Sequence, residues 1–435
     1  MTQIKMKPII VLGKRGGRFR RPDGSLEVVT DEEVLVRRVA ELSRELRAKL
    51  RYSAALLEDT ILRTETDLAQ LEKNALGADA LLVYLVGTMP LHTLYQWQEP
   101  IVAFSGQYAP YLALHAFGVQ RQNRAGITIA LDFQDIDEQI RILDARKKLH
   151  NSRIALLGLP APQFSRWQHL PDLELAREKL GVEFSPLEPR EFVAQLPMIN
   201  SREAEILAER WLQEAKEIVE PTKADVVDSA RIFLALSDML QQRKANAIAI
   251  SCLELMDLKV PPPCYAMSRL RDEGAPNACE GDVIALLSMM LLGYLADEPA
   301  FMGNIISADP ETNILTISHC VVPSKMAGFS QPPKPYILRN RHGINGVTAH
   351  VELDTGQEVT MARLARDLNE IVLIRGELVD CRDTTHCRTT LSVRVNDVRE
   401  FVQCALGNHH ALVYGNLSRQ ARALSQKLGI STTEL

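Results

Sequence analysis

The chain of 435 residues is about two to three times the length of a typical domain, so we expect two or three hydrophobic cores. Its 50 basic and 55 acidic residues give a formal net charge of −5, which provides no general field that would attract a polyanion. We therefore expect neither a nucleic acid nor a membrane as a partner.

Near the N-terminus, the apolar run PIIVLG at residues 8–13 leads into a loop rich in Gly and Arg at residues 13–24. It lacks the apolar core and the small-residue cleavage site of a secretion signal, and no run in the chain reaches the roughly 18 apolar residues that span a bilayer. A cytoplasmic protein is expected. The loop matches no phosphate-binding motif, and a flexible basic loop is the favoured interpretation, although its cations could hold an anionic part of a substrate.

The first part of the chain alternates short apolar runs with longer amphipathic stretches, which is typical of a parallel sheet covered by helices. We expect an α/β domain over residues 1–158, with a helix over residues 31–51 and a boundary near the segment PAPQ. The expected strands are PIIVLG, ALLVYLVG, IVAFSG, GITIALDF and RIALLGL.

A second cycle of strands and helices follows, and we expect a second α/β domain over residues 159–311. Its strands are predicted at VEFSPL and at ANAIAISCLEL. Its helices are predicted over residues 201–219, 223–242, about 265–272 and 283–296.

From about residue 312 the chain changes to strand-like pieces separated by turns, which predicts a β-rich, barrel-like domain over residues 312–435. The expected strands include NILTISHC, GVTAHVEL, EVTMARL, NEIVLIRGELVD, TTLSVRV and HHALVYG. The seven cysteines are dispersed and form no C-x-x-C pair, so we expect reduced thiols. Cys and His also lie close together at residues 380–388, but their spacing fits no zinc module, and we interpret this segment as a polar turn.

The stretch NACEGDVIALLSMMLLGYLADEPAFMGNI, residues 277–305, places two acids before an apolar helix and Asn304 after it. The helix and the following strand are each about 20 Å long, so Glu280 and Asn304 are expected at the same end. In a βαβ unit this is the carboxyl end of the strands, where such sheets bind ligands. The alternative is structural: Asp282 caps the helix and Glu280 is a solvated neighbour.

Three histidines are further candidates. His319 ends the predicted strand in TISHCVVPS, and His409 and His410 begin the strand in GNHHALVYG. A single histidine is more often a hydrogen-bonded structural residue than a ligand. Adjacent residues on a strand face opposite ways, so at most one of His409 and His410 points into a given site.

Four motifs in this order, ACEGDV, FMGNI, SHCVVP and GNHHALVYG, resemble those of the L-fucose isomerase and L-arabinose isomerase superfamily over about residues 200–430. The resemblance implies two Rossmann-like α/β domains followed by a β-barrel domain, assembled as a homotrimer or homohexamer. It also implies a small-molecule sugar as substrate, a divalent cation, usually Mn²⁺, and interconversion of an aldose with its ketose. It implies no further cofactor.

The resemblance also implies roles for individual residues. Glu280 corresponds to a metal ligand that is also an acid/base group, His319 to a further ligand, and His410, rather than His409, to the ligand of the histidine pair. The family has a second carboxylate where this chain has Asn304. Asn304 can ligate a hard cation through its carbonyl oxygen, but it cannot accept a proton as a general base.

Aldose–ketose exchange moves a proton through an enediol, and a cation stabilises the developing oxyanion. With one carboxylate at the mapped positions, three alternatives are open: Asp282 or Glu254 takes the second proton-transfer role, His319 takes it, or the reaction needs one base. We favour Glu280 as the principal base, with Asp282 as a second candidate. The leading hypothesis is a metal-dependent sugar isomerase; the alternatives are an epimerase or lyase, and a non-catalytic sugar-binding protein.

Overall fold

The structure, a computed structural model, describes residues 3–435 with gaps. The residues outside the description are 1–2, 14–15, 22, 24, 51–53, 88, 90, 92–93, 95–96, 106–110, 119–125, 161–168, 342–343 and 386. Parts of the predicted basic loop, most of the PAPQ segment and His386 in the predicted polar turn therefore lie outside it. The chain forms two compact units, Met1–Lys147 and Lys148–Leu435. The division at residues 158 and 311 remains a prediction.

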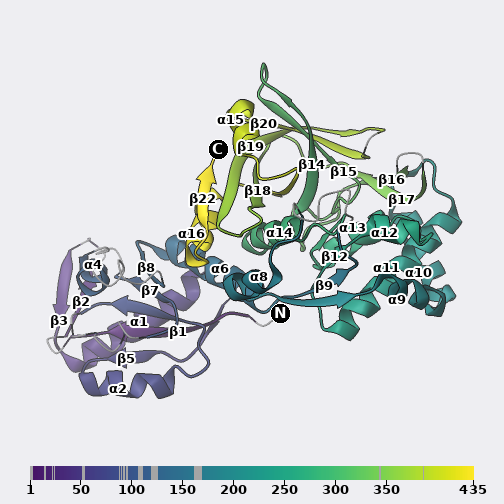
Figure 1. Ribbon diagram of the computed structural model, residues 1–435. Helices are drawn as coiled ribbons and strands as arrows, with labels where there is room; N and C mark the ends of the chain where they lie inside the picture. The colour runs from purple at the N-terminus through teal and green to yellow at the C-terminus, as the bar shows by residue number, and fades with distance from the viewer. Residues whose placement is uncertain are drawn as a thin grey trace. The chain divides into compact units, whose positions relative to one another are not determined.

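The first unit contains a parallel sheet with the strand order β4-β1-β6-β7-β8 and with β5 also paired to β1 (Figure 1). Of the five strands that the sequence predicted for it, RIALLGL instead lies in the sheet of the second unit. Apolar side chains on the two faces of the sheet pack into two separate cores, as expected for a sheet covered on both sides. The strands are β1 (Lys5–Val11), β4 (Ala55–Leu56), β5 (Thr60–Leu62), β6 (Ala80–Leu85), β7 (Ile101–Phe104) and β8 (Ile127–Ala130). A hairpin, β2 (Gly17–Arg20) and β3 (Leu26–Val29), and the helices α1 (Glu32–Lys49), α2 (Glu65–Asn74), α4 (Tyr111–Phe117) and α6 (Phe133–His150) complete the described elements.

The second unit begins with another parallel sheet, in the order β10-β9-β12-β13. Its strands are β9 (Arg153–Leu157), β10 (Glu183–Leu187), β12 (Ala247–Ile250) and β13 (Asn277–Ala278). Its helices are α8 (Leu173–Leu180), α9 (Pro189–Gln195), α10 (Ser201–Glu214), α11 (Lys223–Arg243), α12 (Cys252–Asp257), α13 (Cys264–Asp272) and α14 (Val283–Ala296), with a 3₁₀ turn, η3 (Leu196–Met198). The strand predicted at residues 245–255 is therefore shorter, because the chain turns into α12 at Cys252.

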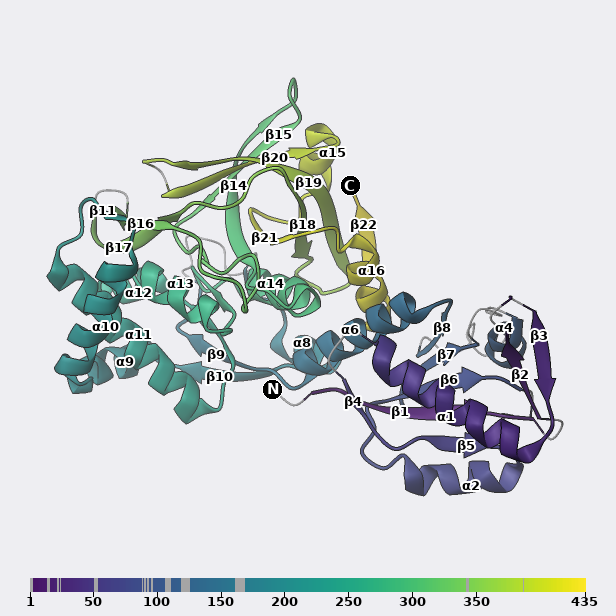
Figure 2. The ribbon, with the colours of Figure 1, turned by 180° about the vertical axis from the view of Figure 1, so that it is seen from behind.

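The C-terminal strands close into the expected barrel. Six antiparallel strands follow one another as β18-β21-β14-β15-β20-β19, and β18 pairs with β19 to complete the circle. Figure 2 shows the same ring from behind. The strands are β14 (Phe301–Asp309), β15 (Ile314–His319), β18 (Gln357–Leu364), β19 (Glu370–Asp383), β20 (Thr389–Val395) and β21 (His409–Tyr414). Strand β22 (Ser431–Glu434) adds to β19, and helices α15 (Val398–Cys404) and α16 (Ser418–Lys427) lie between strands along the chain.

The predicted βαβ unit that contains α14 does not form. The strand after α14 was expected to rejoin a parallel sheet, but β14 is an antiparallel barrel strand between β15 and β21. Similarly, GVTAHVEL forms β17 (Ile344–Val351), which pairs with β16 (Tyr336–Arg341) beside β11 (Glu217–Ile218) in a separate sheet. The mixed architecture of parallel sheets and a barrel agrees with the predicted fold class.

Helix α14 connects the parallel sheet of the second unit to the barrel. Its side chains from Val283 to Leu295 are buried, which is expected of a helix that is apolar all round. In both ribbon views α14 lies between the barrel and strand β9 (Figures 1 and 2). The Ser288 hydroxyl accepts a hydrogen bond from the backbone N–H of Leu364 on β18 (3.0 Å), so the helix and the barrel wall are directly bonded.

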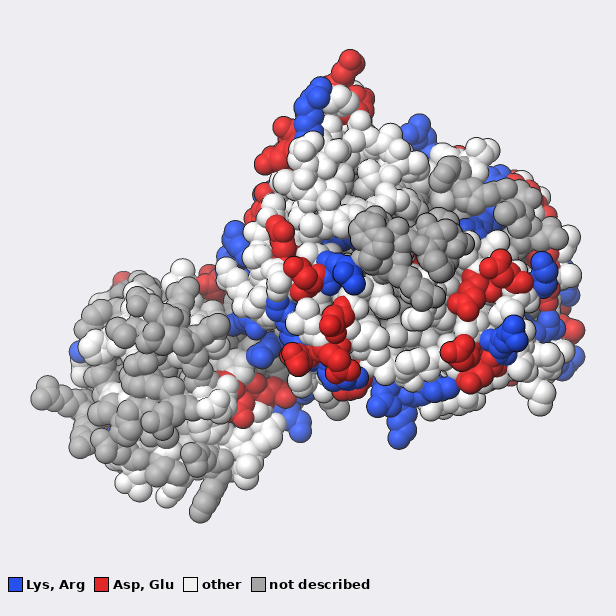
Figure 3. Space-filling view, viewed as in Figure 1, with Lys and Arg blue, Asp and Glu red and all other residues white. Residues whose placement is uncertain are grey.

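None of the described helices has both the length and the hydropathy needed to cross a membrane. On the face shown in Figure 3, the acidic and basic side chains of the second unit are interspersed among neutral ones.

Candidate metal and catalytic site

The turn between β13 and α14 carries both predicted acids in an unusual backbone conformation. Glu280 and Gly281 have positive φ angles of 59° and 67°. Glycine adopts this conformation freely, but a residue with a side chain loses about 1–2 kcal/mol in it. The N–H of Gly281 donates to the carbonyl of Ile250 at the end of β12 (2.9 Å), which fixes the turn. Such strained residues cluster at functional sites.

The carboxylate of Asp282 accepts hydrogen bonds from three neighbours. One carboxylate oxygen accepts the N–H of Ala285 and caps α14 (2.8 Å). The other accepts from Arg363 Nη1 (3.1 Å) and from His409 Nδ1 (2.9 Å). Burial opposes ionisation of this carboxyl, but Arg363 and His409 outweigh that effect and hold its pKa well below the usual range. Asp282 is therefore a buried anion that is already fully engaged.

This anion orients His409. Because ionised Asp282 can only accept, His409 Nδ1 donates the proton of this hydrogen bond, which leaves Nε2 as the ring atom that can bind a cation. His409 Nε2 is buried and has no hydrogen-bond partner among the described residues, and it lies 3.7 Å from a Glu280 carboxylate oxygen. A metal-binding histidine commonly donates the N–H of its other ring nitrogen to a carboxylate, as His409 donates to Asp282. The donor atoms at this point therefore fit a cation.

Three side chains converge here, and we call Glu280, His319 and His409 the Glu280 cluster. One ligand atom from each lies within 4.8 Å of the other two. The two histidines are 4% and 2% exposed, whereas the Glu280 side chain is 21% exposed. Oxygen and imidazole ligands suit several divalent cations. A small molecule can approach the cluster from the side of the partly exposed Glu280 carboxylate.

Helix α13 anchors the segment that follows His319. Buried Arg271 donates to the carbonyl of Val321 (2.7 Å), and the carboxylate of Asp272 accepts from the Ser324 hydroxyl (2.6 Å). Burial, helped by the neighbouring His409, lowers the pKa of His319 to about 3, so this imidazole is neutral and available as a ligand. Its Nδ1 accepts a long hydrogen bond from the N–H of Val321 (3.2 Å). A cation that binds Nδ1 would displace this hydrogen bond, and one that binds Nε2 would displace the proton there.

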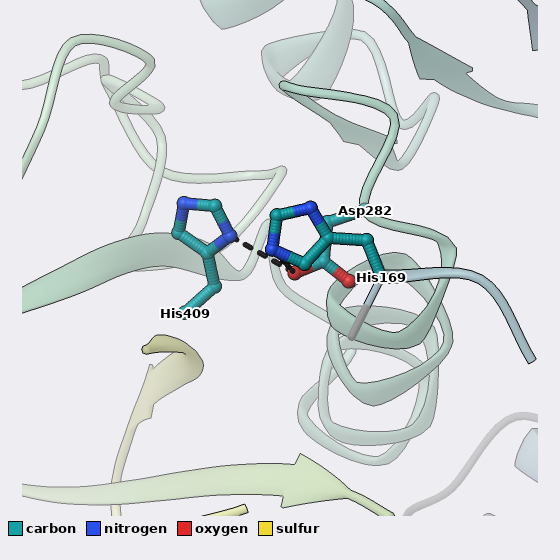
Figure 4. Close-up of side chains that lie close together, drawn as sticks. All are labelled: His169, Asp282 and His409. Carbon is teal, nitrogen blue, oxygen red and sulfur yellow. Dashed lines mark hydrogen bonds and ion pairs between the residues drawn. The ribbon is translucent and has the colours of Figure 1, made fainter. Parts of the chain in front are cut away.

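A second group, His169, Asp282 and His409, also lies within 4.8 Å, and we call it the Asp282 cluster. Figure 4 shows Asp282 with the two rings, and a dashed line from His409 to the carboxylate. His169 Nε2 is 3.6 Å from Asp282 Oδ2, and its burial lowers its pKa. A cation here would meet the Arg363 guanidinium and displace the His409 proton. The Glu280 cluster is the better metal site of the two.

The remaining predicted residues lie around these clusters. His410 contacts the ring of Phe401 (5.3 Å between centroids) and belongs to neither cluster; of the two adjacent histidines, His409 is the one that lies in both clusters. Asn304 is the cross-strand partner of His409, and its amide oxygen accepts from Asn408. Glu254 lies on α12 and belongs to neither cluster.

The sequence analysis missed two residues, His169 and Arg363. Arg363 is 1% exposed and also donates to the carbonyl of His409 (2.7 Å), so it holds both partners of the Asp282–His409 hydrogen bond. Neither residue lies in a motif with a recognisable spacing, and only the fold brings them to α14.

Comparison with known proteins adds two relatives. The chain is 23% identical over 310 residues to a sulfoquinovose isomerase of Alkalicoccus urumqiensis, covering 68% of this chain and 67% of that protein. It is 23% identical over 358 residues to a sulfoquinovose isomerase of Clostridium sp. (strain MSTE9), covering 77% and 78%. No family model matches the chain.

Proposed function

We propose that this chain is a metal-dependent sugar isomerase that interconverts an aldose and its ketose. The observation that carries the proposal is the buried Nε2 atom of His409, whose ring Asp282 orients and which lies 3.7 Å from a carboxylate oxygen of Glu280. The names of both relatives support the reaction type. A site with a partly exposed carboxylate and a neutral His319 suits proton transfer next to a bound cation.

In the proposed mechanism Glu280 removes the proton from the carbon beside the carbonyl and returns it to the adjacent carbon. A divalent cation, with Mn²⁺ as first choice, would be held by Glu280, His319 and His409, and it supplies Lewis-acid stabilisation of the developing oxyanion. Asp282 and Arg363 keep His409 oriented. Asp282 itself is a poor candidate for proton transfer, because its carboxylate is buried and its pKa is lowered.

We further propose that the substrate is a sulfonated aldose. The relatives are named for sulfoquinovose, which is such a sugar. Half-buried Arg341, at the end of β16, offers a matching cation: it has no carboxylate partner among the described residues, and its Nε is buried without a hydrogen bond. Its Nη1 donates to the Met256 sulfur (3.0 Å). Its charge contributes to the lowered pKa of His319, so it lies near the Glu280 cluster. Arginine binds oxyanions through two parallel hydrogen bonds.

The test is an isomerase assay of the purified chain with Mn²⁺ on sulfoquinovose and on its unsulfonated counterpart, glucose, with the ketose products measured. We expect turnover of the sulfonated sugar, abolished by Glu280→Gln. In Arg341→Met we expect KM for that sugar to rise by about ten- to a hundred-fold, since a charge-assisted hydrogen bond of about 1.5–3 kcal/mol is lost. No ketose from any sulfonated or neutral aldose in a broad panel would refute the proposal.

Asn304 favours a second candidate, a one-base reaction such as epimerisation of a related sugar. It stands where a second carboxylate is expected, and its amide oxygen is bonded to Asn408. If the parent chain epimerises a sugar without forming ketose, and Asn304→Asp gains isomerase activity, this candidate replaces the first.

A further inference from the structure

Two buried thiols lie in contact beside the Glu280 turn. Cys252 and Cys279 are 1% and 3% exposed, and their sulfur atoms are 3.1 Å apart. A disulfide requires about 2.05 Å, so a movement of about 1 Å would join them. Neither Cys252 nor Cys279 is in a disulfide in this structure.

The fold explains why these two thiols meet. Cys252 follows β12 and begins α12, and Cys279 directly follows β13. The two strands are parallel neighbours, with Ala249 opposite Ala278. Neighbouring strands are about 4.8 Å apart, and disulfides join Cα atoms about 4.4–6.8 Å apart. A bond between these strand ends is therefore sterically accessible without refolding.

We propose that Cys252 and Cys279 are a modification site, which peroxide converts into a reversible disulfide that inactivates the Glu280 cluster. One thiolate attacks hydrogen peroxide, takes one oxygen to become a sulfenic acid and releases hydroxide. The second thiolate then attacks that sulfur and displaces a second hydroxide, and the two protons that the thiols lost convert the two hydroxides into water. In balance, two thiols and one peroxide give one disulfide and two waters. The effect on activity rests on the proposed function, whereas formation of the bond does not.

The link from the thiols to the site is covalent and short. Glu280 is the next residue after Cys279, and its left-handed backbone is fixed between that cysteine and the Gly281–Ile250 hydrogen bond. Drawing the Cys279 sulfur toward Cys252 shifts the start of this turn. A displacement of about 1 Å in a reacting group can cost about a hundred-fold in rate, so we expect oxidation to lower activity by about ten- to a hundred-fold.

The test treats the full chain with hydrogen peroxide and reads the result by mass spectrometry. We expect an intact mass lower by two hydrogens, and a peptide that joins residues 252 and 279 and disappears in Cys252→Ser. The matched control is Cys404→Ser, which removes a partly exposed cysteine at the end of α15 and should leave the bond intact. Isomerase activity and Mn²⁺ binding should fall together and return after treatment with a thiol reductant.

Two results would overturn the proposal: no 252–279 peptide at any peroxide dose, or a formed bond that leaves both activity and Mn²⁺ binding unchanged. Peptide mapping of the parent chain decides the first even if Cys252→Ser fails to fold. A chain that forms the bond and loses Mn²⁺ binding, but isomerises no sugar, would refute the proposed function and leave the modification site standing.

Discussion

The two compact units both contain a parallel sheet, but they bury polar groups differently. The buried polar and charged side chains described in the first unit are separate from one another along the chain: Lys7, Ser105, Gln139 and Asp144. In the second unit, Asp282, Arg363, His169, His319 and His409 are buried within one connected group. Burying ionisable groups costs free energy, so their concentration at the start of α14, against the barrel strands, marks this place as the candidate functional site.

The largest effects are expected at Glu280. Glu280→Gln keeps the shape of the side chain and removes the base, so kcat/KM for the proposed reaction should fall by at least about a thousand-fold. Glu280→Gly should lose as much activity while its free energy of unfolding rises by about 1 kcal/mol, because glycine relieves the left-handed strain. Steady-state kinetics and denaturant unfolding measure the two. A Glu280→Gly protein that is less stable would contradict the strained-site interpretation.

The next largest effect is on stability. Arg363→Met leaves Asp282 buried beside His409 without its cation, and breaking a buried ion pair from one side costs about 3–5 kcal/mol. The control is Lys7→Met in the first unit, where the ammonium donates to the carbonyl of Glu58 and burial lowers its pKa; we expect a change of about 1 kcal/mol or less in the free energy of unfolding. Equal losses from the two substitutions in urea unfolding would remove the contrast between the units.

Asp282→Asn tests the orientation of His409. The neutral amide accepts the hydrogen bond of His409 Nδ1 less strongly than the carboxylate does. Loss of a carboxylate that orients a metal-binding histidine weakens metal affinity by about 10- to 100-fold. The same substitution at buried Asp144 of the first unit should leave Mn²⁺ affinity unchanged. Calorimetric titration of both variants compares them directly, and a full loss of affinity in the Asp144 variant would count against the assignment.

The last effect is a pH dependence of stability in the metal-free chain. Burial lowers the pKa of both His319 and His410 from the ordinary 6.5 to about 3. The unfolded chain therefore binds more protons below pH 6.5, and stability should fall as the pH drops, by about 1.4 kcal/mol per pH unit for each histidine. Asp282 adds to this loss only below its ordinary value of 3.8. Urea unfolding from pH 7 to pH 5 measures the slope, which should be smaller in His410→Gln; a flat profile would show that these imidazoles are not buried as described.

The sequence correctly predicted those helices and strands that depend on residues close together in the chain. The helix over residues 283–296 was predicted with its observed bounds, because Asp282 is an N-cap and the apolar run is continuous. The barrel strands after residue 312 were also predicted correctly in kind. The sequence analysis placed β14 in the wrong sheet, because its partner β21 begins at His409, far along the chain, and a short apolar run does not reveal a distant partner.

The candidate site was predicted in part for the same reason. Motif order brought Glu280, His319 and the histidine pair into consideration, but the choice within that pair depends on strand register, and a shift by one residue exchanges the two faces. His169 and Arg363 reach α14 only through tertiary folding. No spacing in the sequence connects either residue with Asp282.

The most direct test compares the two adjacent histidines. Metal-free protein, His409→Ala and His410→Ala are titrated with Mn²⁺ by calorimetry. The account predicts one ion per chain for the parent, retained affinity in His410→Ala and loss of binding in His409→Ala. Loss in His410→Ala with binding retained in His409→Ala, or no binding by the parent chain, would contradict a cation held between Glu280, His319 and His409.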